Sequence, residues 1–285
     1  MQTLLAILTN PAKSEDFIKY TLSMSVDLGC YLHFLYIQNP AMYTISTGTA
    51  TTTPHPVAND LDVQMLETDR ENVLEQIRET LDGIKENAKP GSIEVSAEAG
   101  TMSIVVDHFI SNNKAHMVVI EGNDDSGFFT SEYSGTDVIS KVNCPGWVIP
   151  SGMTYTPFKN IIYATDYQDA DIATLKRLIA LTKKISPKIT ALHITDSEDF
   201  EEKTMQHGFK DMVAKDTGYD NIVVKTEKED KDIEEKINDV AINAHADLIV
   251  LLKENKGFIE KIFTRSSTKK VIRKAKLPVL VYHEK

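Results

Sequence analysis

A basic segment near the end of the chain has the side chains to bind an anion. From Lys253 to Lys276 it contains nine basic and two acidic residues. Within it, the guanidinium group of Arg265 could bind a phosphate in a bidentate manner. Basic residues spread along a helix are more often a solvated face, and this alternative stays open. The segment lacks the regular alternation of basic and aromatic residues that favours nucleic-acid binding, so we expect no nucleic-acid partner.

A carboxylate at the end of an apolar segment is a second candidate. Thr165 and Asp166 follow directly after the apolar residues that begin at Ile161. The Asp166 carboxylate could accept hydrogen bonds from a ribose or a base, or it could cap the following helix, and both interpretations stay open. His193 lies inside another apolar strand, which is typical of a hydrogen-bonded core histidine rather than of a ligand.

The other reactive side chains form no recognisable catalytic or metal-binding pattern. The histidines, including His55, His108, His116 and His245, form neither an HExxH nor an HxH spacing. The sequence also lacks GxxxxGKS, GxxxxGKT and GxSxG, and it offers no convincing pair of catalytic carboxylates. We therefore expect no catalytic residues, no metal ligands and no enzyme activity.

Length and charge indicate two globular units with different electrostatics. The chain has 285 residues, of which 41% are apolar and 26% charged, a balance that suggests about two domains. The net charge is -11, with 8 basic and 20 acidic residues in positions 1–150 but 23 basic and 22 acidic in positions 151–285. The acidic first half should repel nucleic-acid phosphates at long range.

Cysteine usage and hydropathy favour a cytoplasmic protein. Cys30 and Cys144 lie far apart, in neither a CxxC nor a metal-ligand spacing, which fits unpaired buried thiols in a reducing compartment. The start of the chain, from Met1 to Asn10, is typical of a first strand rather than of a signal peptide. No stretch approaches the roughly 18 apolar residues of a membrane span, so we expect no membrane association.

An internal repeat organises the chain. The segment VISKVNCPGWVI, which begins at Val138, recurs 133 residues later as VIRKAKLPVLVY, which begins at Val271. Upstream, AHMVVI at Ala115 matches ADLIVL at Ala246 with an offset of 131. The loop between these anchors is therefore two residues shorter in the first copy.

Between these anchors, strand and helix patterns alternate. The predicted strands are Thr3 to Leu8, Tyr31 to Ile37, Ile93 to Ala97, Met117 to Glu121, Trp147 to Ile149, Ile161 to Thr165, Ile189 to Thr195, Asn221 to Lys225, Leu248 to Leu252 and Val279 to Tyr282. Helical spacing is present at Phe17 to Leu28, Leu61 to Ile84, Ile172 to Ile185 and Ile233 to Ala244. Strands that are apolar throughout indicate an α/β fold, with a mostly parallel sheet covered on both faces.

Two segments join these elements. The uncharged stretch PSGMTYTP, from Pro150 to Pro157, predicts a short linker between domains at 1–150 and 158–285, which should pack together. The segment from Asn39 to Asn59 has six threonines and three prolines. We interpret it as a surface loop, with a lid over a ligand site as the alternative.

The order of these motifs resembles the universal stress protein family, in its tandem two-domain type. The second half carries TD at Thr165, ALHIT at Ala191, ADLIVLL at Ala246 and RSSTKKVIRKAKLPVLV at Arg265, and the resemblance covers nearly the whole chain twice. It implies two doubly wound domains, each with a five-stranded, mostly parallel sheet in the order 3-2-1-4-5. Ligands would then bind where strands 1 and 4 diverge, at the carboxyl ends of the strands.

The resemblance also implies a nucleotide site. Nucleotide-binding members have an acidic residue after strand 1 and a phosphate loop of the form G-x2-G-x9-G-S/T after strand 4, where backbone N–H groups enclose phosphate. In the second half, Asp166 matches the acidic residue, and Ile194 occupies a strand-2 position that usually lines the base pocket. The three glycine positions are occupied by Leu252, Asn255 and Arg265, and Ser266 matches the closing residue. The site implied is therefore Thr165, Asp166, Ile194, Asn255, Arg265, Ser266 and Ser267.

The first half departs further from the family pattern. Thr9 and Asn10 stand where the acidic residue would be, and Glu121 and Asp124 stand at the first two glycine positions. Carboxylates at the mouth of a phosphate site repel the ligand, so we expect no triphosphate there.

The leading hypothesis is that the protein is a non-enzymatic regulatory or binding module of the stress response. It would bind ATP or another adenine nucleotide, if any, only in the second domain. Weak ATP hydrolysis occurs in some relatives, but no base or metal ligand set supports it here. The alternative is a protein-interaction scaffold in which both nucleotide sites are vestigial. Family dimers pair through the last strand, which implies an intramolecular pseudo-dimer here, with further homodimerisation left open.

Overall fold

The computed structural model describes most of the chain. The described residues are 2–8, 14–38, 60–84, 93–112, 114–122, 138–139, 142–197, 199–253, 271 and 275–284. The predicted Thr-rich loop at 39–59 lies outside them. No helix in the described part of the chain is both long enough and apolar enough to cross a membrane.

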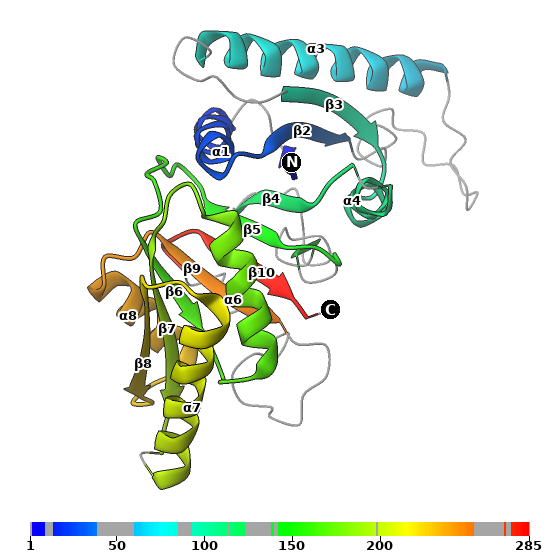
Figure 1. Cartoon of the computed structure of the whole chain (residues 1–285). Coiled ribbons are helices and arrows are strands. Elements are labelled where there is room, and N and C mark those ends of the chain that lie inside the picture. Colours follow the sequence, from blue (N-terminus) through cyan, green and yellow to red (C-terminus); the bar gives the residue numbers. More distant parts are fainter. Residues whose placement is uncertain are drawn as a thin grey trace, which may run out of the picture.

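The ten described strands form one sheet in the order β3-β2-β1-β4-β5-β10-β9-β6-β7-β8 (Figure 1). The strands of the first half are β1 (Thr3–Leu8), β2 (Tyr31–Gln38), β3 (Ile93–Ala99), β4 (Met117–Gly122) and β5 (Gly146–Pro150). Those of the second half are β6 (Asn160–Ala164), β7 (Lys188–Thr195), β8 (Ile222–Lys228), β9 (Leu248–Lys253) and β10 (Val279–His283). Within each half all neighbouring strands are parallel and follow the expected order 3-2-1-4-5.

The two halves form one continuous sheet through their last strands, which is the pairing that the family resemblance implied. Strands β5 and β10 pair antiparallel, with Leu280 opposite Trp147 at the centre of the pairing. The 133-residue repeat offset makes these two residues equivalent, so each half presents the same position to the other. This is the geometry of an isologous dimer interface formed within a single chain. The pairing leaves neither of these two strands with a free edge.

Helices cover both faces of the sheet. They are α1 (Glu15–Leu28), α3 (Asp60–Ile84), α4 (Met102–Ser111), α6 (Asp169–Leu181), α7 (Phe200–Thr217) and α8 (Ile233–Asn243). Buried residues of α1, α3, α6 and α7 belong to one apolar cluster, which spans both halves on one face. Those of α4 and α8 belong to a second cluster on the opposite face, together with Val271.

The hydrophobic patterns predicted every described strand to within three residues, but they missed two helices. α4 was not predicted, and neither was α7, of which Phe209 and Val213 are the buried residues. Such a narrow apolar stripe gives a weak helical period. α6 ends at Leu181, before the predicted end at Ile185.

Tyr155 of the predicted linker contacts the first half and also Phe158, which directly follows the linker. The ring of Tyr155 contacts Tyr20 edge to face, at 5.2 Å between centroids, and its hydroxyl donates to Asp27 at 2.8 Å. Phe158 stacks on Trp147 with centroids 5.6 Å apart, and both side chains are fully buried. The aromatic cluster therefore stabilises the β5–β10 pairing, because each aromatic pair contributes free energy beyond that of the area it buries.

Candidate functional site

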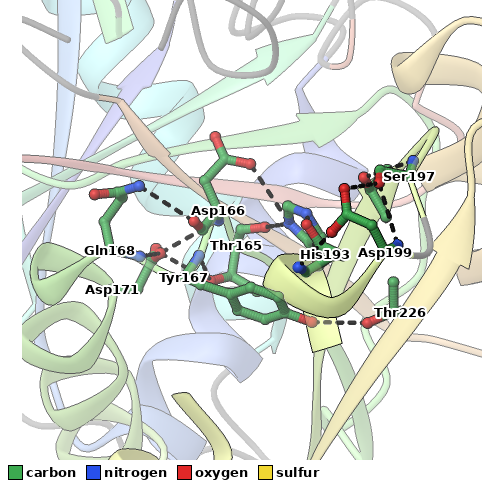
Figure 2. A network of polar contacts seen from close by, with 11 residues as sticks. Thr165, Asp166, Tyr167, Gln168, Asp171, His193, Ser197, Asp199 and Thr226 are labelled. Atoms are coloured by element: carbon green, nitrogen blue, oxygen red, sulfur yellow. Dashed lines mark hydrogen bonds and ion pairs between the residues drawn. The ribbon is translucent and has the colours of Figure 1, made fainter. Parts of the chain in front are cut away.

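A buried carboxylate organises the carboxyl end of β6. The side chain of Asp171, in the first turn of α6, accepts hydrogen bonds from the hydroxyls of Tyr163 at 2.6 Å and Thr165 at 2.8 Å. It also accepts from the backbone N–H groups of Gln168 at 3.0 Å and Asp166 at 3.3 Å. The turn between β6 and α6 is therefore built around one side chain (Figure 2).

Burial shifts the pKa values of Asp171 and Tyr163. It raises the pKa of Asp171, although the four hydrogen bonds favour the charged form and oppose that shift. The pKa of Tyr163 is raised well above its usual value, first by burial and then by the adjacent carboxylate. A buried carboxylate that accepts several hydrogen bonds is costly to replace, because its donors would lose their partner.

Asp166 lies at the carboxyl edge of the sheet and does not cap α6. The N-cap residue is Gln168, and the carboxylate that receives its backbone N–H belongs to Asp171. The Asp166 carboxylate instead faces His193, with 3.7 Å between Oδ1 and Nδ1. Of the two roles open for Asp166, capping is therefore wrong and ligand binding stays a prediction.

Tyr167 follows with an unusual backbone conformation. Its φ of 62° lies in the left-handed region, which costs energy for a residue with a large side chain. This conformation places its ring over His193, with centroids 4.4 Å apart, and next to Phe209. The Tyr167 hydroxyl lies 2.8 Å from that of Thr226 on β8.

His193 lies at the centre of these contacts, as Figure 2 shows. Its Nδ1 atom is 2.8 Å from the backbone oxygen of Thr165, and its Nε2 atom is 3.3 Å from Oε1 of Glu202 on α7. The prediction of a hydrogen-bonded core histidine is confirmed. The two carboxylates that flank it were not predicted to be its neighbours.

A pocket of about 290 Å³ opens beside Glu202. Thr195, Ser197, Thr226 and Lys203 also line it. The pocket lies where β7 and β8 end beneath the start of α7. The carboxyl edge of the sheet therefore has open polar space next to the His193 cluster.

The other predicted site residues lie elsewhere or outside the described part of the chain. Ile194 is buried on the opposite face of the sheet from His193, in the cluster that contains Val271. Leu252, at the first glycine position, is a buried core residue. The predicted residues Asn255, Arg265, Ser266 and Ser267 lie outside the described residues.

In the first half, Glu121 is the described member of the carboxylates predicted to repel phosphate. It is half-buried near the end of β4. Thr9, Asn10 and Asp124 lie outside the described residues. Among the residues that the structure describes, no group of three or more His, Cys, Asp or Glu side chains could bind a metal ion.

Three residues of the cluster were missed by sequence reasoning. Asp171 carried a signal, because an acidic residue three positions after an N-cap is the pattern of a capping box. Glu202 belongs to the helix that was not predicted. Tyr167 carried no signal, since its role depends on a backbone conformation that tyrosine rarely adopts.

The second half matches a known family. Residues 157–283 match the model of the universal stress protein family. No curated protein is significantly similar in sequence to the chain.

Solved structures show the same fold over the whole chain. A universal stress protein from Archaeoglobus fulgidus is 14% identical, with a TM-score of 0.70 over 99% of this chain and 96% of that one. A protein from Pseudomonas aeruginosa described as a universal stress protein is 10% identical, with a TM-score of 0.56 over 99% and 93%. The cytoplasmic domain of a prokaryotic cation chloride cotransporter is 9% identical, with a TM-score of 0.56 over 98% and 94%. At these identities the likeness concerns the fold alone, and it extends through both halves.

Proposed function

Since residues 157–283 match the model of the universal stress protein family, we propose that the chain is a non-enzymatic regulatory or binding module of the stress response. It binds ATP or another adenine nucleotide at the carboxyl edge of the second half only. The two halves act as domains at 1–150 and 158–285, and the protein works in the cytoplasm.

The placement of Asp166 is the observation that carries this proposal. Asp166 directly follows the turn-forming end of β6, which pairs with β7 on one side and β9 on the other. In an open parallel sheet, the crossovers diverge at such a strand and leave a crevice for a ligand. The Asp171 network fixes the backbone of Asp166, so its carboxylate is oriented before a ligand arrives. Preorganisation of this kind lowers the cost of accepting ribose or base donors.

The phosphates would bind on the segment that follows β9. There Asn255, Arg265, Ser266 and Ser267 offer amide, guanidinium and hydroxyl donors in place of the family's glycine amides. Ile194 supplies an apolar contact for the base, on the face of the sheet where Val271 is also buried.

A thermal-shift titration of the full chain with ATP and Mg²⁺ tests the proposal. We expect a concentration-dependent rise of Tm in the wild type, which Asp166→Ala removes. Glu121→Gln in the first half is the matched control and should leave the shift unchanged. A full shift in Asp166→Ala would refute the assignment of the site.

The scaffold alternative is favoured by a different observation. The β5–β10 pairing joins both halves in one sheet, and polar groups at the end of β6 bond to one another. In this case, no nucleotide would raise Tm, and the protein would give a sharp oligomer peak in size-exclusion chromatography. The same fold in the cytoplasmic domain of a transporter is compatible with such a role.

A further inference from the structure

The position of His193 determines which of its ring nitrogens carries a hydrogen. Nδ1 lies 2.8 Å from the backbone oxygen of Thr165. A carbonyl oxygen only accepts hydrogen bonds, so Nδ1 must be the donor. In a neutral imidazole with a hydrogen on Nδ1, the Nε2 atom has a lone pair and no hydrogen.

That lone pair would face a carboxylate. Nε2 is 3.3 Å from Oε1 of Glu202, and the two side chains are 8% and 15% exposed. Oε1 of Glu202 is buried, and it has no hydrogen-bond partner among the residues that the structure describes. Two acceptors in such a place repel each other unless a proton lies between them. The contact is therefore stable only if the pair carries one proton, which the imidazole, as the stronger base, takes.

A charged His193 would also act on Asp166. Oδ1 of Asp166 is 3.7 Å from Nδ1, and its side chain is 10% exposed. An imidazolium would thus lie between two carboxylates from different elements, Asp166 from the end of β6 and Glu202 from α7. With a neutral ring, the two negative charges would lie in the same poorly solvated region without this cation between them.

Among the remaining groups around the ring, Tyr167 favours a cation. The ring of Tyr167 packs on the imidazole at 4.4 Å between centroids, and aromatic faces attract cations. Thr226, which is opposite His193 in the β7–β8 register, is uncharged. On α7, Phe209 contacts Tyr167 and is apolar, whereas Lys203 lines the adjacent pocket with Glu202.

We propose that His193 and Glu202 are positioning residues that share one proton, and that the resulting imidazolium orients the Asp166 carboxylate for nucleotide binding. The proton-sharing pair stands on geometry alone, whereas its effect on affinity rests on the proposed nucleotide site. The positive ring offsets the charge of Asp166, which would otherwise repel the phosphates of an approaching nucleotide. Its ion pair with Glu202 also holds the start of α7 against the edge of the sheet.

Nuclear magnetic resonance of the full chain with ¹⁵N-labelled histidine tests the proton directly. His193→Gln identifies the signals of this ring among those of the eight histidines. In the wild type we expect a hydrogen bonded to each ring nitrogen. In Glu202→Gln the amide can donate to Nε2, so the contact persists while only Nδ1 keeps its hydrogen. A wild-type ring without a hydrogen on Nε2, or a signal unchanged by Glu202→Gln, would overturn the proposal.

Calorimetric titration with ATP and Mg²⁺ tests the effect on the site. Glu202→Gln should weaken ATP binding about tenfold, because it removes the ion pair that lies beside the Asp166 carboxylate. Glu201→Gln is the matched control, because Glu201 is exposed on the same helix turn. Equal affinities in Glu202→Gln and wild type would overturn the positioning role. If the wild type binds no ATP, the proposed function fails, while the magnetic resonance result still decides the protonation.

Discussion

The same strand end is apolar in the first half and polar in the second. Strand register makes Ala6 the counterpart of Tyr163, because the equivalent residues Val119 and Val250 pair with them. Two positions later, Leu8 stands where Thr165 does. In the helix that follows, Phe17 and Asp171 both occupy the third position, and both are buried.

This difference shows how one fold holds a network of buried polar groups in one copy and apolar packing at the same place in the other. In the first half the buried end of β1 packs against an aromatic ring, which needs no hydrogen-bond partner. In the second half each buried polar group requires one, and Asp171 provides partners for two hydroxyls and two N–H groups. The polar arrangement keeps backbone and carboxylate groups in place at the edge of the proposed nucleotide site.

The strands next to these two, β2 beside β1 and β7 beside β6, differ in a compensating way. Opposite Ala6 is the large Phe34, whereas opposite Tyr163 is the small Ala191, so the volume under the helix is conserved. Further along, Tyr36 is the counterpart of His193. Tyr36 donates to the carboxylate of Asp69 on α3 at 3.1 Å, whereas His193 contacts the carboxylate of Glu202 on α7 at 3.3 Å.

The largest expected effect concerns the joint where equivalent residues meet. Trp147→Ala should lower the free energy of unfolding by about 3–5 kcal/mol, because it leaves a cavity and removes the stacking on Phe158. Leu280→Ala should cost about 2–4 kcal/mol. Urea denaturation measures both. Phe200→Ala, at a side chain that is 85% exposed, is the control and should change the free energy by less than about 0.5 kcal/mol.

Acid should destabilise the second half through His283, whose counterpart in the first half is Pro150. Burial lowers the pKa of His283 to about 4. The unfolded chain binds this proton near pH 6.5. The contribution of the neutral, buried His283 to the free energy of unfolding is therefore complete above pH 6.5 and is lost as pH falls towards 4. The loss amounts to about 3 kcal/mol.

Unfolding free energies measured between pH 7 and pH 4 check this. His283→Gln should flatten the dependence relative to wild type. The exposed His207→Gln should leave it unchanged. An equally steep profile in His283→Gln would contradict the assignment.

A smaller effect compares the two third-position residues. Asp171→Asn should cost about 2 kcal/mol, because an amide N–H₂ would face donors that now bond to the carboxylate. Phe17→Leu, in the apolar copy, should cost about 1 kcal/mol. Chemical denaturation of both variants gives the comparison, and a larger loss for Phe17→Leu would mean that the polar network contributes little.

The smallest expected effect separates packing from binding. Ile194 and Ile37 are equivalent and both buried, so Val at either position should cost about 1 kcal/mol. If Ile194 lines the base pocket as proposed, only Ile194→Val should also weaken ATP binding, by a few-fold. Thermal denaturation and calorimetric titration measure the two quantities. Equal ATP affinity in both variants would remove Ile194 from the site.

The sequence predicted the framework better than the site. Apolar runs such as that of β9 determine strands directly, and the repeat fixed the equivalence of the two halves. The pairing of the last strands was expected from the family resemblance, and β5 and β10 do pair. A weakly amphipathic helix such as α7 leaves little trace in hydropathy, so the neighbour of His193 on that helix could not be found.

For the site, residue type alone was misleading. Asp166 was the obvious carboxylate, yet Asp171 makes the hydrogen bonds that shape the turn. A buried Asp is rare, and its burial here depends on donors from Tyr163 and Thr165, which approach it only after β6 and α6 have packed. Tyr167 required the backbone conformation itself to be known.

Isothermal titration calorimetry of the full-length chain with ATP and Mg²⁺ tests most directly whether the two halves differ in function. We predict one binding event per chain, which Asp166→Asn abolishes and Glu121→Gln leaves intact. Two equivalent events per chain, or one event that survives Asp166→Asn, would contradict a nucleotide site confined to the second half.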